Sequence, residues 1–452
     1  MPQKKSSKKS VVILTINCGS SSVKYSLFNW KNHEVMAEGI VERIGIKGSL
    51  IRHQVPHRRE HVKHEVVPDH HEAIKEIIHT LLDKKVGVIQ SLSVITAVGH
   101  RVVHGGEHFT KSVLVDGPEG KVVKTFRNLS TLAPLHNPNN ILGIISAMDI
   151  LPRIPHIAIM DTAFLHTMPK HTFLYAGPYE WYSKYGIRKY GFHGTSHLYV
   201  SRRVAALLGK KPSDVNLITC HIGNGVSFTA IKNGEAYEHS MGFTPLEGLI
   251  MGTRSGDIDP AIVSYISEME LVRSERVITI LNKESGLKGI TGEYVDRRDI
   301  FQASLEGNER CKLAIEMEVH RMKKYIGSYI AALGRIDAMA FTAGAGEKAW
   351  WLREKALDNM ENLGIILDKE LNRKAVSKNH EFLISKEASP IKIFVIPTNE
   401  ELVMVEDVVA IVEGRYDIHT KFTYSFEDVN YVDNMREEAY KRELKIKKMK
   451  KG

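Results

Sequence analysis

Short apolar runs recur along the chain, and Gly, Asn or Asp stops each of them. The runs are VVILTIN (11–17), VITAVG (94–99), HIAIMD (156–161), NLITCHIG (216–223), AMAFTAG (338–344) and IKIFVIP (391–397). Runs of this length without regular alternation are typical of strands that are buried on both faces of a largely parallel sheet. The pattern therefore predicts an α/β protein.

Between these runs, apolar residues recur at helical spacing. One stripe consists of Ala73, Ile74, Ile77, Ile78, Leu81 and Leu82. A second helix is predicted to begin at Asn137-Pro138, because asparagine caps helices and proline is favoured at the first helical position. Residues 308–333 carry the longest helical pattern. Strands and helices are therefore expected to alternate.

Two segments about two hundred residues apart resemble each other. VILTINCGSSSVKYSLFNWKNHEV (12–35) and NLITCHIGNGVSFTAIKNGEAYEH (216–239) each contain an apolar strand, a turn rich in Gly, Ser or Asn, and a second strand. This repetition predicts two related domains that face each other. The alternative is that two unrelated hairpins happen to look alike.

The domain boundaries follow from this repeat. We predict a first domain at 1–165 that is completed by 396–420, and a second domain at 166–395. Residues 421–452 are predicted to form a basic C-terminal extension.

The net charge of the chain does not indicate a nucleic-acid partner. The 452 residues are 43% hydrophobic and 25% charged, as in ordinary soluble proteins, and they carry a net charge of +9. Residues 1–10 contribute +4, and residues 436–452 contribute +5 through eight Lys or Arg and three Glu. The body between is neutral, so we expect two solvated basic tails and no nucleic-acid-binding face.

Cysteine usage and hydropathy predict a cytoplasmic protein. Cys18, Cys220 and Cys311 are odd in number and widely spaced, which indicates a reducing compartment without disulfides or a zinc site. The apolar run 11–16 is too short for the core of a signal peptide, and no run is long enough to span a membrane.

Three glycine-containing turns follow predicted strands and suit phosphate groups. They are Asn17–Ser22 with Lys24 nearby, His221–Gly225, and Gly344–Glu347 before a predicted helix. Such turns leave backbone N–H groups free to donate to phosphate oxygens, and a helix N-terminus adds a favourable dipole. The alternative for any one of them is an ordinary polar turn.

Two arginines lie among glycines that let the backbone approach a ligand. Arg101 lies in GHRVVHGG (99–106), and Arg254 lies in MGTRSGDIDP (251–260). A guanidinium fork matches carboxylate and phosphate oxygens. A structural ion pair is the alternative, and for Arg254 we favour a functional role.

Three further positions suggest chemistry at the ends of elements. Asp161 ends a strand, at the edge where α/β proteins bind ligands, although it could instead cap the next segment. His193 lies between glycines and could donate to a phosphoryl group, with a zinc pair with His197 as the alternative. Glu400 and Glu401 could hold hydrated magnesium or stabilise the start of a helix.

Together, these motifs resemble those of acetate kinases. They occur in the family order as NCGSSSVK, GHRVVHGG, LAPLHNP, DTAF, TMP, YGFHGTSH, HIGNG, MGTRSGDIDP and PTNEE. The resemblance covers roughly residues 11–415. It implies an α/β fold of two duplicated ribonuclease H-like domains with a nucleotide cleft between them, as in the superfamily of sugar kinases, chaperone ATPases and actin. It also implies a homodimer.

The resemblance assigns site residues position by position. It assigns Asn17 and Glu400 to a magnesium site, and Asp161, His193 and Arg254 to catalysis. It implies that the substrate contacts Arg101, Val103, Leu135, His136, Phe192 and Pro245. Nucleotide contacts are expected at Lys24, His221, Ile222, Gly223, Asn224, Gly225, Asp296, Arg297, Arg298, Gly344, Ala345, Gly346, Glu347 and Lys348.

The implied activity is reversible, magnesium-dependent phosphoryl transfer from ATP to acetate by a direct in-line mechanism, with no membrane partner. A propionate or butyrate kinase and an actin-like or chaperone-like ATPase are the alternatives. Three features depart from the family pattern: the basic tails, Cys18 in place of alanine, and Lys348 in place of asparagine. The last of these leaves the preferred phosphoryl donor open.

Overall fold

The computed structural model describes residues 11–133 and 136–449, which divide into two compact units. Unit 1 comprises Met1–Ala163 and Glu400–Thr423, and unit 2 comprises Phe164–Asn399 and Tyr424–Gly452. The chain therefore passes from unit 2 to unit 1 at Asn399–Glu400 and returns at Thr423–Tyr424.

Unit 1 is built on an eight-stranded sheet in the order β5-β4-β3-β2-β1-β6-β8-β7. Its strands are β1 (Val12–Cys18), β2 (Ser22–Asn29), β3 (Glu34–Glu42), β4 (Leu50–Gln54), β5 (His61–His64), β6 (Ile95–Val102), β7 (Val113–Leu114) and β8 (His156–Met160). Strands β1, β6 and β8 are parallel, so their carboxyl ends lie at one edge of the sheet.

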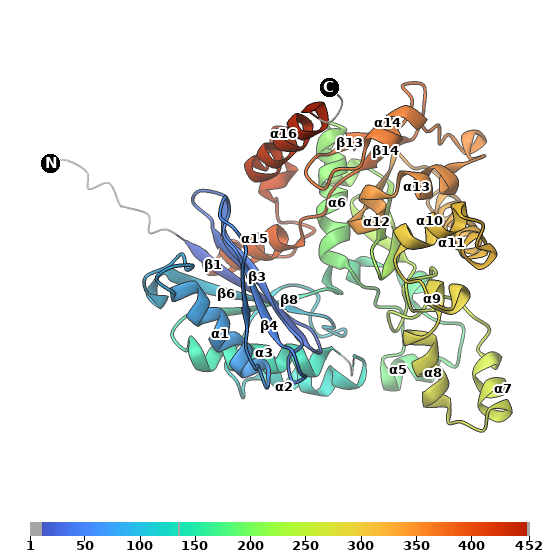
Figure 1. Cartoon of the computed structure of the whole chain (residues 1–452). Helices are drawn as coiled ribbons and strands as arrows, with labels where there is room; N and C mark the ends of the chain where they lie inside the picture. The colour runs from blue at the N-terminus through green and yellow to red at the C-terminus, as the bar shows by residue number, and fades with distance from the viewer. Residues whose placement is uncertain (1–10, 134–135, 450–452) are drawn as a thin grey trace. The chain divides into compact units, whose positions relative to one another are not determined.

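Helices cover both faces of this sheet (Figure 1). The main ones are α1 (His70–Leu82), α2 (Lys121–Asn128), α3 (Asn137–Ile150) and α15 (Glu400–Val412). The predicted stripe of α1 is confirmed, because Ala73, Ile74 and Ile77 are buried in one core cluster with alternate residues of β1. On the opposite face, Val408 of α15 packs so closely on Gly99 of β6 that a side chain there would clash.

Unit 2 is built on a six-stranded sheet in the order β11-β10-β9-β12-β14-β13. Its strands are β9 (Leu217–Ile222), β10 (Val226–Lys232), β11 (Glu235–His239), β12 (Ala338–Thr342), β13 (Phe382–Leu383) and β14 (Lys392–Val395). The order β11-β10-β9-β12-β14 matches β3-β2-β1-β6-β8 of unit 1, with three antiparallel strands followed by two parallel ones. The duplicated fold predicted from the two hairpins is thereby confirmed.

Helices make up much of unit 2. They are α4 (Lys170–Phe173), α5 (Tyr179–Tyr185), α6 (Gly194–Leu207), α7 (Ala261–Met269), α8 (Ser274–Lys283), α9 (Gly286–Thr291), α10 (Arg297–Leu305), α11 (Glu309–Leu333), α12 (Ala343–Lys348), α13 (Trp350–Leu357), α14 (Lys369–Lys374) and α16 (Asn434–Met449). The 25-residue α11 confirms the long helix predicted at 308–333. None of the helices in the described part of the chain is long and apolar enough to cross a membrane.

The C-terminal segment corrects the expectation of a solvated tail. Tyr424 and Phe426 are only 1% and 0% exposed, and the Phe426 ring packs against the ring of Tyr199 on α6 at 4.7 Å between centroids. Arg203 of α6 donates to the carbonyl oxygens of Phe426 at 2.7 Å and Asp428 at 3.0 Å. These aromatic residues fold the segment onto unit 2. The basic residues 1–10 lie outside the described residues.

The local packing explains how the Cys18 side chain is accommodated. Gly143 of α3 faces the Cys18 sulfur, and a methyl group at position 143 would clash with it. Burial raises the pKa of the Cys18 thiol to about 12, so it stays protonated. All three cysteines are free and buried, which makes them structural residues.

Candidate active site

In unit 1, parallel strand register brings three of the predicted residues to one edge of the sheet. Ile16 of β1 pairs with His100 of β6, and Val102 of β6 pairs with Met160 of β8. Asn17, Arg101 and Asp161 directly follow Ile16, His100 and Met160 in the chain, so they lie toward the carboxyl ends of β1, β6 and β8. Ligands of open α/β sheets bind at such carboxyl ends.

Arg101 and Asp161 form a largely buried ion pair. The Nη2 of Arg101 lies 2.8 Å from Oδ2 of Asp161, whose side chain is 2% exposed. The carboxylate is the main cause of the raised pKa of Arg101, so this guanidinium is always charged. Its Nε atom is buried and has no hydrogen-bond partner among the described residues. A buried N–H donor that has no partner within the protein suits an anionic ligand.

Glu400 is the first residue of α15. The charges of Arg101, Asp161 and Lys24 all act on its carboxylate. Burial raises the pKa of Glu400, and repulsion by Asp161 adds to this, whereas the charges of Arg101 and Lys24 lower it. Two neighbouring carboxylates favour a cation between or beside them.

The residues of this edge fit a magnesium ion. Mg²⁺ prefers oxygen ligands and takes few of them from protein, because it keeps waters and binds substrate phosphates. The Glu400 carboxylate and the Asn17 amide supply such oxygens. No group of three or more His, Cys, Asp or Glu in the described part of the chain could hold a metal.

The loop that follows β6 is held by Asn140, which the sequence did not single out, and by Asn137, which was predicted as a helix cap but lies inside α3 and bonds this loop instead. Asn140 Oδ1 accepts the N–H of Val103 at 3.0 Å, and its Nδ2 donates to the Cys18 carbonyl at 2.8 Å. Asn137 bonds both backbone groups of His104, at 3.2 and 3.0 Å. Asn137 directly follows the partly buried His136, and Asn140 lies about one turn later in α3. Their position beside a predicted site residue was the signal that the sequence offered. Leu135 lies outside the described residues.

In unit 2, His193 is held in an uncommon conformation. It precedes α6 with φ of 58°, which costs a non-glycine residue about 1–3 kcal/mol and persists where the surroundings over-determine it. Its Nδ1 lies 2.8 Å from Ser227 Oγ, and its ring stacks on the His221 ring with centroids 4.1 Å apart. Such strain is typical of functional sites.

A second layer of buried side chains fixes this histidine. Ser227 Oγ also lies 2.8 Å from Nε2 of His197, which is 0% exposed. His221 Nδ1 lies 2.9 Å from Ser196 Oγ. Burial lowers the pKa of His197 well below its usual value, so it is neutral and serves as a hydrogen-bonding support. Sequence reasoning did not single out Ser227.

Arg254 borders the same glycine turn as His193. A Cβ atom added to Gly225 would lie 3.3 Å from His193 Cε1 and 3.6 Å from Arg254 Nη1. The Nη1 group donates to the Pro245 carbonyl at 3.3 Å, and no carboxylate of the described residues pairs with Arg254. Burial lowers its pKa. The two side chains and the backbone of Gly225 therefore surround a position suited to a negatively charged group.

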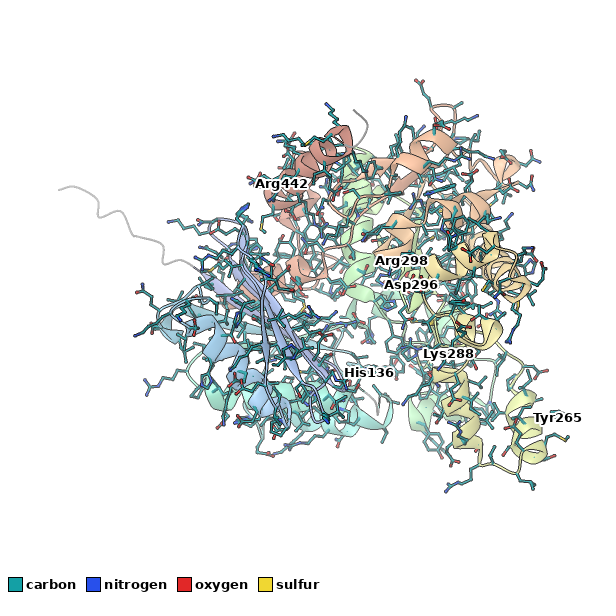
Figure 2. The ribbon with its side chains drawn as sticks, viewed as in Figure 1. His136, Tyr265, Lys288, Asp296, Arg298 and Arg442 are labelled. Carbon is teal, nitrogen blue, oxygen red and sulfur yellow. The ribbon has the colours of Figure 1, made fainter. Side chains whose placement is uncertain are left out.

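Most of the predicted nucleotide residues of unit 2 line one pocket of about 550 Å³. Its walls are formed by Gly223, Asn224, Val295, Asp296, Arg297, Arg298, Gly344, Ala345, Lys348, Ala349 and Trp351. Asp296 and Arg298 form an ion pair at 2.6 Å on its rim and lie next to each other in Figure 2. This volume is in the range of pockets for small ligands. Val295, Ala349 and Trp351 were not predicted.

Two of the predicted nucleotide segments are arranged differently from what the sequence indicated. Arg297 uses its guanidinium within the protein, bonding Glu318 at 2.6 Å and the Gly223 carbonyl at 2.7 Å, so it supports the glycine turn. Gly344–Lys348 belong to the short helix α12, where an open loop before a helix was expected. Arg353 stabilises this helix by donating to the Gly346 carbonyl at 2.7 Å.

The predicted site residues are divided between the units. Lys24, Val103 and His136 belong to unit 1, whereas Phe192 and Pro245 belong to unit 2. Phe192 is 3% exposed and directly precedes His193, and its N–H donates to His239 at 3.0 Å. Val103 is 8% exposed.

Comparison with known proteins agrees with this geometry. The acetokinase family matches residues 12–406. The chain is 56% identical over 422 residues to the acetate kinase of Geobacter metallireducens, which covers 93% of this chain and all of that protein. The crystal structure of Porphyromonas gingivalis acetate kinase superimposes with a TM-score of 0.84 at 43% identity, covering 89% of this chain and 100% of the other.

A propionate kinase from Francisella tularensis is also similar, with a TM-score of 0.81 at 39% identity over 88% of this chain and 99% of the other. The match of the family model spans both units and every motif described above. The chain belongs to the acetokinase family.

Proposed function

We propose that the protein is an acetate kinase, which transfers the γ-phosphoryl group of ATP to acetate and forms acetyl phosphate and ADP, reversibly. Its membership of the acetokinase family along residues 12–406 and its 56% identity to an acetate kinase support this activity. The observation that carries the proposal is the presence of two half-buried arginines, Arg101 and Arg254, each in a glycine-flanked motif of that family.

In the proposed reaction, a carboxylate oxygen of acetate forms a bond to the γ-phosphorus while the bond to the bridging oxygen of ADP breaks. Acetate is already ionised at neutral pH, so no strong general base is required. Catalysis must then come from alignment and charge neutralisation. We assign charge neutralisation to Arg101, Arg254 and His193, and positioning to Asp161.

Asn17 and Glu400 would hold the magnesium ion. When bound, Mg²⁺ supplies further neutralisation of charge on the phosphate oxygens. The nucleotide would occupy the pocket between Asp296–Arg298 and α12, with its phosphates toward the Gly223–Gly225 turn. Among the residues that line this pocket, Trp351 stacks on Phe301 at 4.3 Å, which gives one wall a rigid aromatic support.

A series of short carboxylates tests this proposal. With ATP and Mg²⁺, we expect acetate to be the best acceptor, propionate to be weaker and butyrate to be poor, because each methylene in an apolar pocket changes kcat/KM by about 10–200-fold. Acyl phosphate formation would be measured for each acid at equal enzyme concentration. Equal efficiency with butyrate would contradict the apolar pocket, and a preference for propionate would favour the activity named for the Francisella protein.

Lys348 tests the choice of phosphoryl donor. This side chain is exposed and lines the nucleotide pocket. We expect Lys348→Asn to change the KM for ATP by only a few-fold, because an exposed charge contributes about 0–1 kcal/mol. Donor competition among ATP, GTP and pyrophosphate would be measured for both forms, with Lys355→Asn on the exposed side of α13 as the control. A wild type that prefers pyrophosphate would overturn the nucleotide assignment.

We also propose that the protein is a cytoplasmic homodimer, and that α7 contributes to its interface. None of the nine residues of α7 is buried, and Ile262, Tyr265 and Met269 on one side of it are 42%, 63% and 65% exposed. Figure 2 shows Tyr265 projecting from this helix. The next residues add Leu271 at 92% exposure. Apolar side chains gathered in this way are typical of a surface that a partner covers.

Tyr265→Asp should therefore shift the mass measured by light scattering from dimer toward monomer, since it places a charge in an apolar interface. Val66→Asp, at an 87% exposed position of unit 1, is the control and should leave the mass unchanged. A monomeric wild type would contradict the proposed dimer, and a dimeric Tyr265→Asp variant would place the interface elsewhere.

A further inference from the structure

The C-terminal helix α16 and the residue before it bind residues 397–399, through which the chain leaves unit 2. We call this set of bonds the grip. Arg436 donates from Nη1 to the Pro397 carbonyl at 2.8 Å and from Nη2 to the Thr398 carbonyl at 2.7 Å. Asp433 forms an ion pair with the same guanidinium, with its Oδ2 3.4 Å from Arg436 Nε. That oxygen also accepts from Asn399 Nδ2 at 3.4 Å. Arg436 of α16 and Asp433, which directly precedes that helix, thus fix three successive residues.

The gripped segment is bonded in turn to the helix that lines the nucleotide pocket. The N–H of Ile396, next to Pro397, donates to the Phe341 carbonyl at 2.9 Å, two residues before α12 begins. The backbone of Thr398 also lies near the Glu347 carboxylate of α12 and helps to lower its pKa. Glu347 is 7% exposed, and burial raises its pKa, whereas the nearby charge of Arg436 lowers it. A buried carboxylate of this kind depends on its few donors.

The neighbours of Glu347 in α12 are walls of the pocket. Gly344, Ala345 and Lys348 all line it. A continuous set of contacts therefore runs from Arg436 through the backbone of Thr398 to Glu347 and the pocket wall. The two-carbonyl grip needs the planar guanidinium fork, because a lysine ammonium cannot donate along two parallel directions from one rigid group.

This grip lies outside the part of the chain that the family model matches. The match ends at residue 406, whereas the gripping residues belong to 433–436. Tyr424 and Phe426, buried on unit 2, anchor the segment that carries α16 back to this position.

We propose that Arg436 and Asp433 are positioning residues, through which the C-terminal helix sets the geometry of the nucleotide pocket. This inference rests on the proposed function, in that the pocket must bind a nucleotide. Neither residue touches the reacting groups. Loss of the grip should loosen Thr398 and Glu347 and weaken ATP binding, while the KM for acetate stays unchanged.

The test compares the full-length Arg436→Gln and Arg436→Lys variants with wild type. Arg442→Gln is the matched control, because Arg442 (labelled in Figure 2) is an exposed arginine of the same helix and, among the described residues, bonds only the Glu438 carbonyl, at 3.4 Å. ATP binding would be measured by calorimetry, KM would be measured for both substrates, and hydrogen exchange would be followed at 343–348. We expect a rise of about fivefold in the dissociation constant of ATP for Arg436→Gln.

The same variant should exchange faster at 343–348, and Arg436→Lys should show an intermediate effect. Arg442→Gln should match wild type. If Arg436→Gln lowers only the melting temperature, with ATP affinity and exchange at 343–348 unchanged, α16 is a purely structural addition and the inference is wrong. If Arg436→Gln does not fold, the same criterion applies to Arg436→Lys, which keeps the charge. A folded wild type that binds no ATP would instead contradict the proposed function.

Discussion

Replacing Arg254 with alanine is expected to lower kcat by about 10²–10³-fold while changing the dissociation constant of ATP by no more than a few-fold. Arg254 is half-buried, borders Gly225 together with His193, and has no carboxylate partner among the described residues. Its charge is therefore free to stabilise negative charge that develops on the phosphoryl group. Steady-state kinetics with acetate and ATP, together with calorimetric ATP binding, would separate the two effects.

Lysine at position 254 should restore only part of the rate, because it lacks the planar fork. The control is Arg273→Ala, since the Arg273 side chain is 86% exposed and pairs only with Glu275. It should leave kcat within twofold. Near-normal turnover of Arg254→Ala would remove this residue from the mechanism, and a loss seen only in ATP affinity would reassign it to nucleotide binding.

Deleting residues 424–452 is expected to destabilise unit 2 severely. The deletion removes the fully buried Tyr424 and Phe426, and loss of one large buried aromatic side chain costs about 3–5 kcal/mol. It also takes two carbonyl acceptors from Arg203, whose side chain is 3% exposed. Because a typical domain is stable by only about 5–15 kcal/mol, we expect poor folding or a large fall in melting temperature.

Calorimetry and near-ultraviolet circular dichroism of the purified variants would measure this loss. Deletion of residues 442–452 alone is the control, because it removes only the end of α16, which has no buried residue. The control should melt within a few degrees of the full chain. An equal melting temperature for the longer deletion would mean that the packing of Tyr424 and Phe426 adds little to stability.

The fold was largely predictable because its signals are local. Each buried strand is a short apolar run ended by a polar turn, as at 12–18 and 217–222, and the repeated hairpin disclosed the duplication. Parallel register then placed Asn17, Arg101 and Asp161 at one edge. Such an inference needs only the order of the elements.

The partner of each side chain was less predictable, because it comes from distant parts of the chain. Arg297 is bound to Glu318 and to the Gly223 carbonyl. The residues next to Arg297 in the sequence do not indicate either bond. Trp351 lies outside the motifs quoted from the sequence, so nothing in them pointed to it. The charge of the C-terminal segment favoured a solvated tail, although its aromatics Tyr424 and Phe426 left a structural role open, since composition averages over residues whereas burial is decided by single side chains.

The late position of α15 in the sequence has a consequence for how the chain folds during synthesis on the ribosome. Helix α15 covers one face of the unit 1 sheet, and its residues Leu402–Ala410 are all buried. Ser112 bonds Asp407 at a separation of 295 residues. The first three hundred and ninety-nine residues therefore emerge before that sheet receives its cover. During synthesis the N-terminal unit must wait with an apolar face uncovered while unit 2 is made, which makes this nascent state the one most exposed to aggregation and chaperone capture.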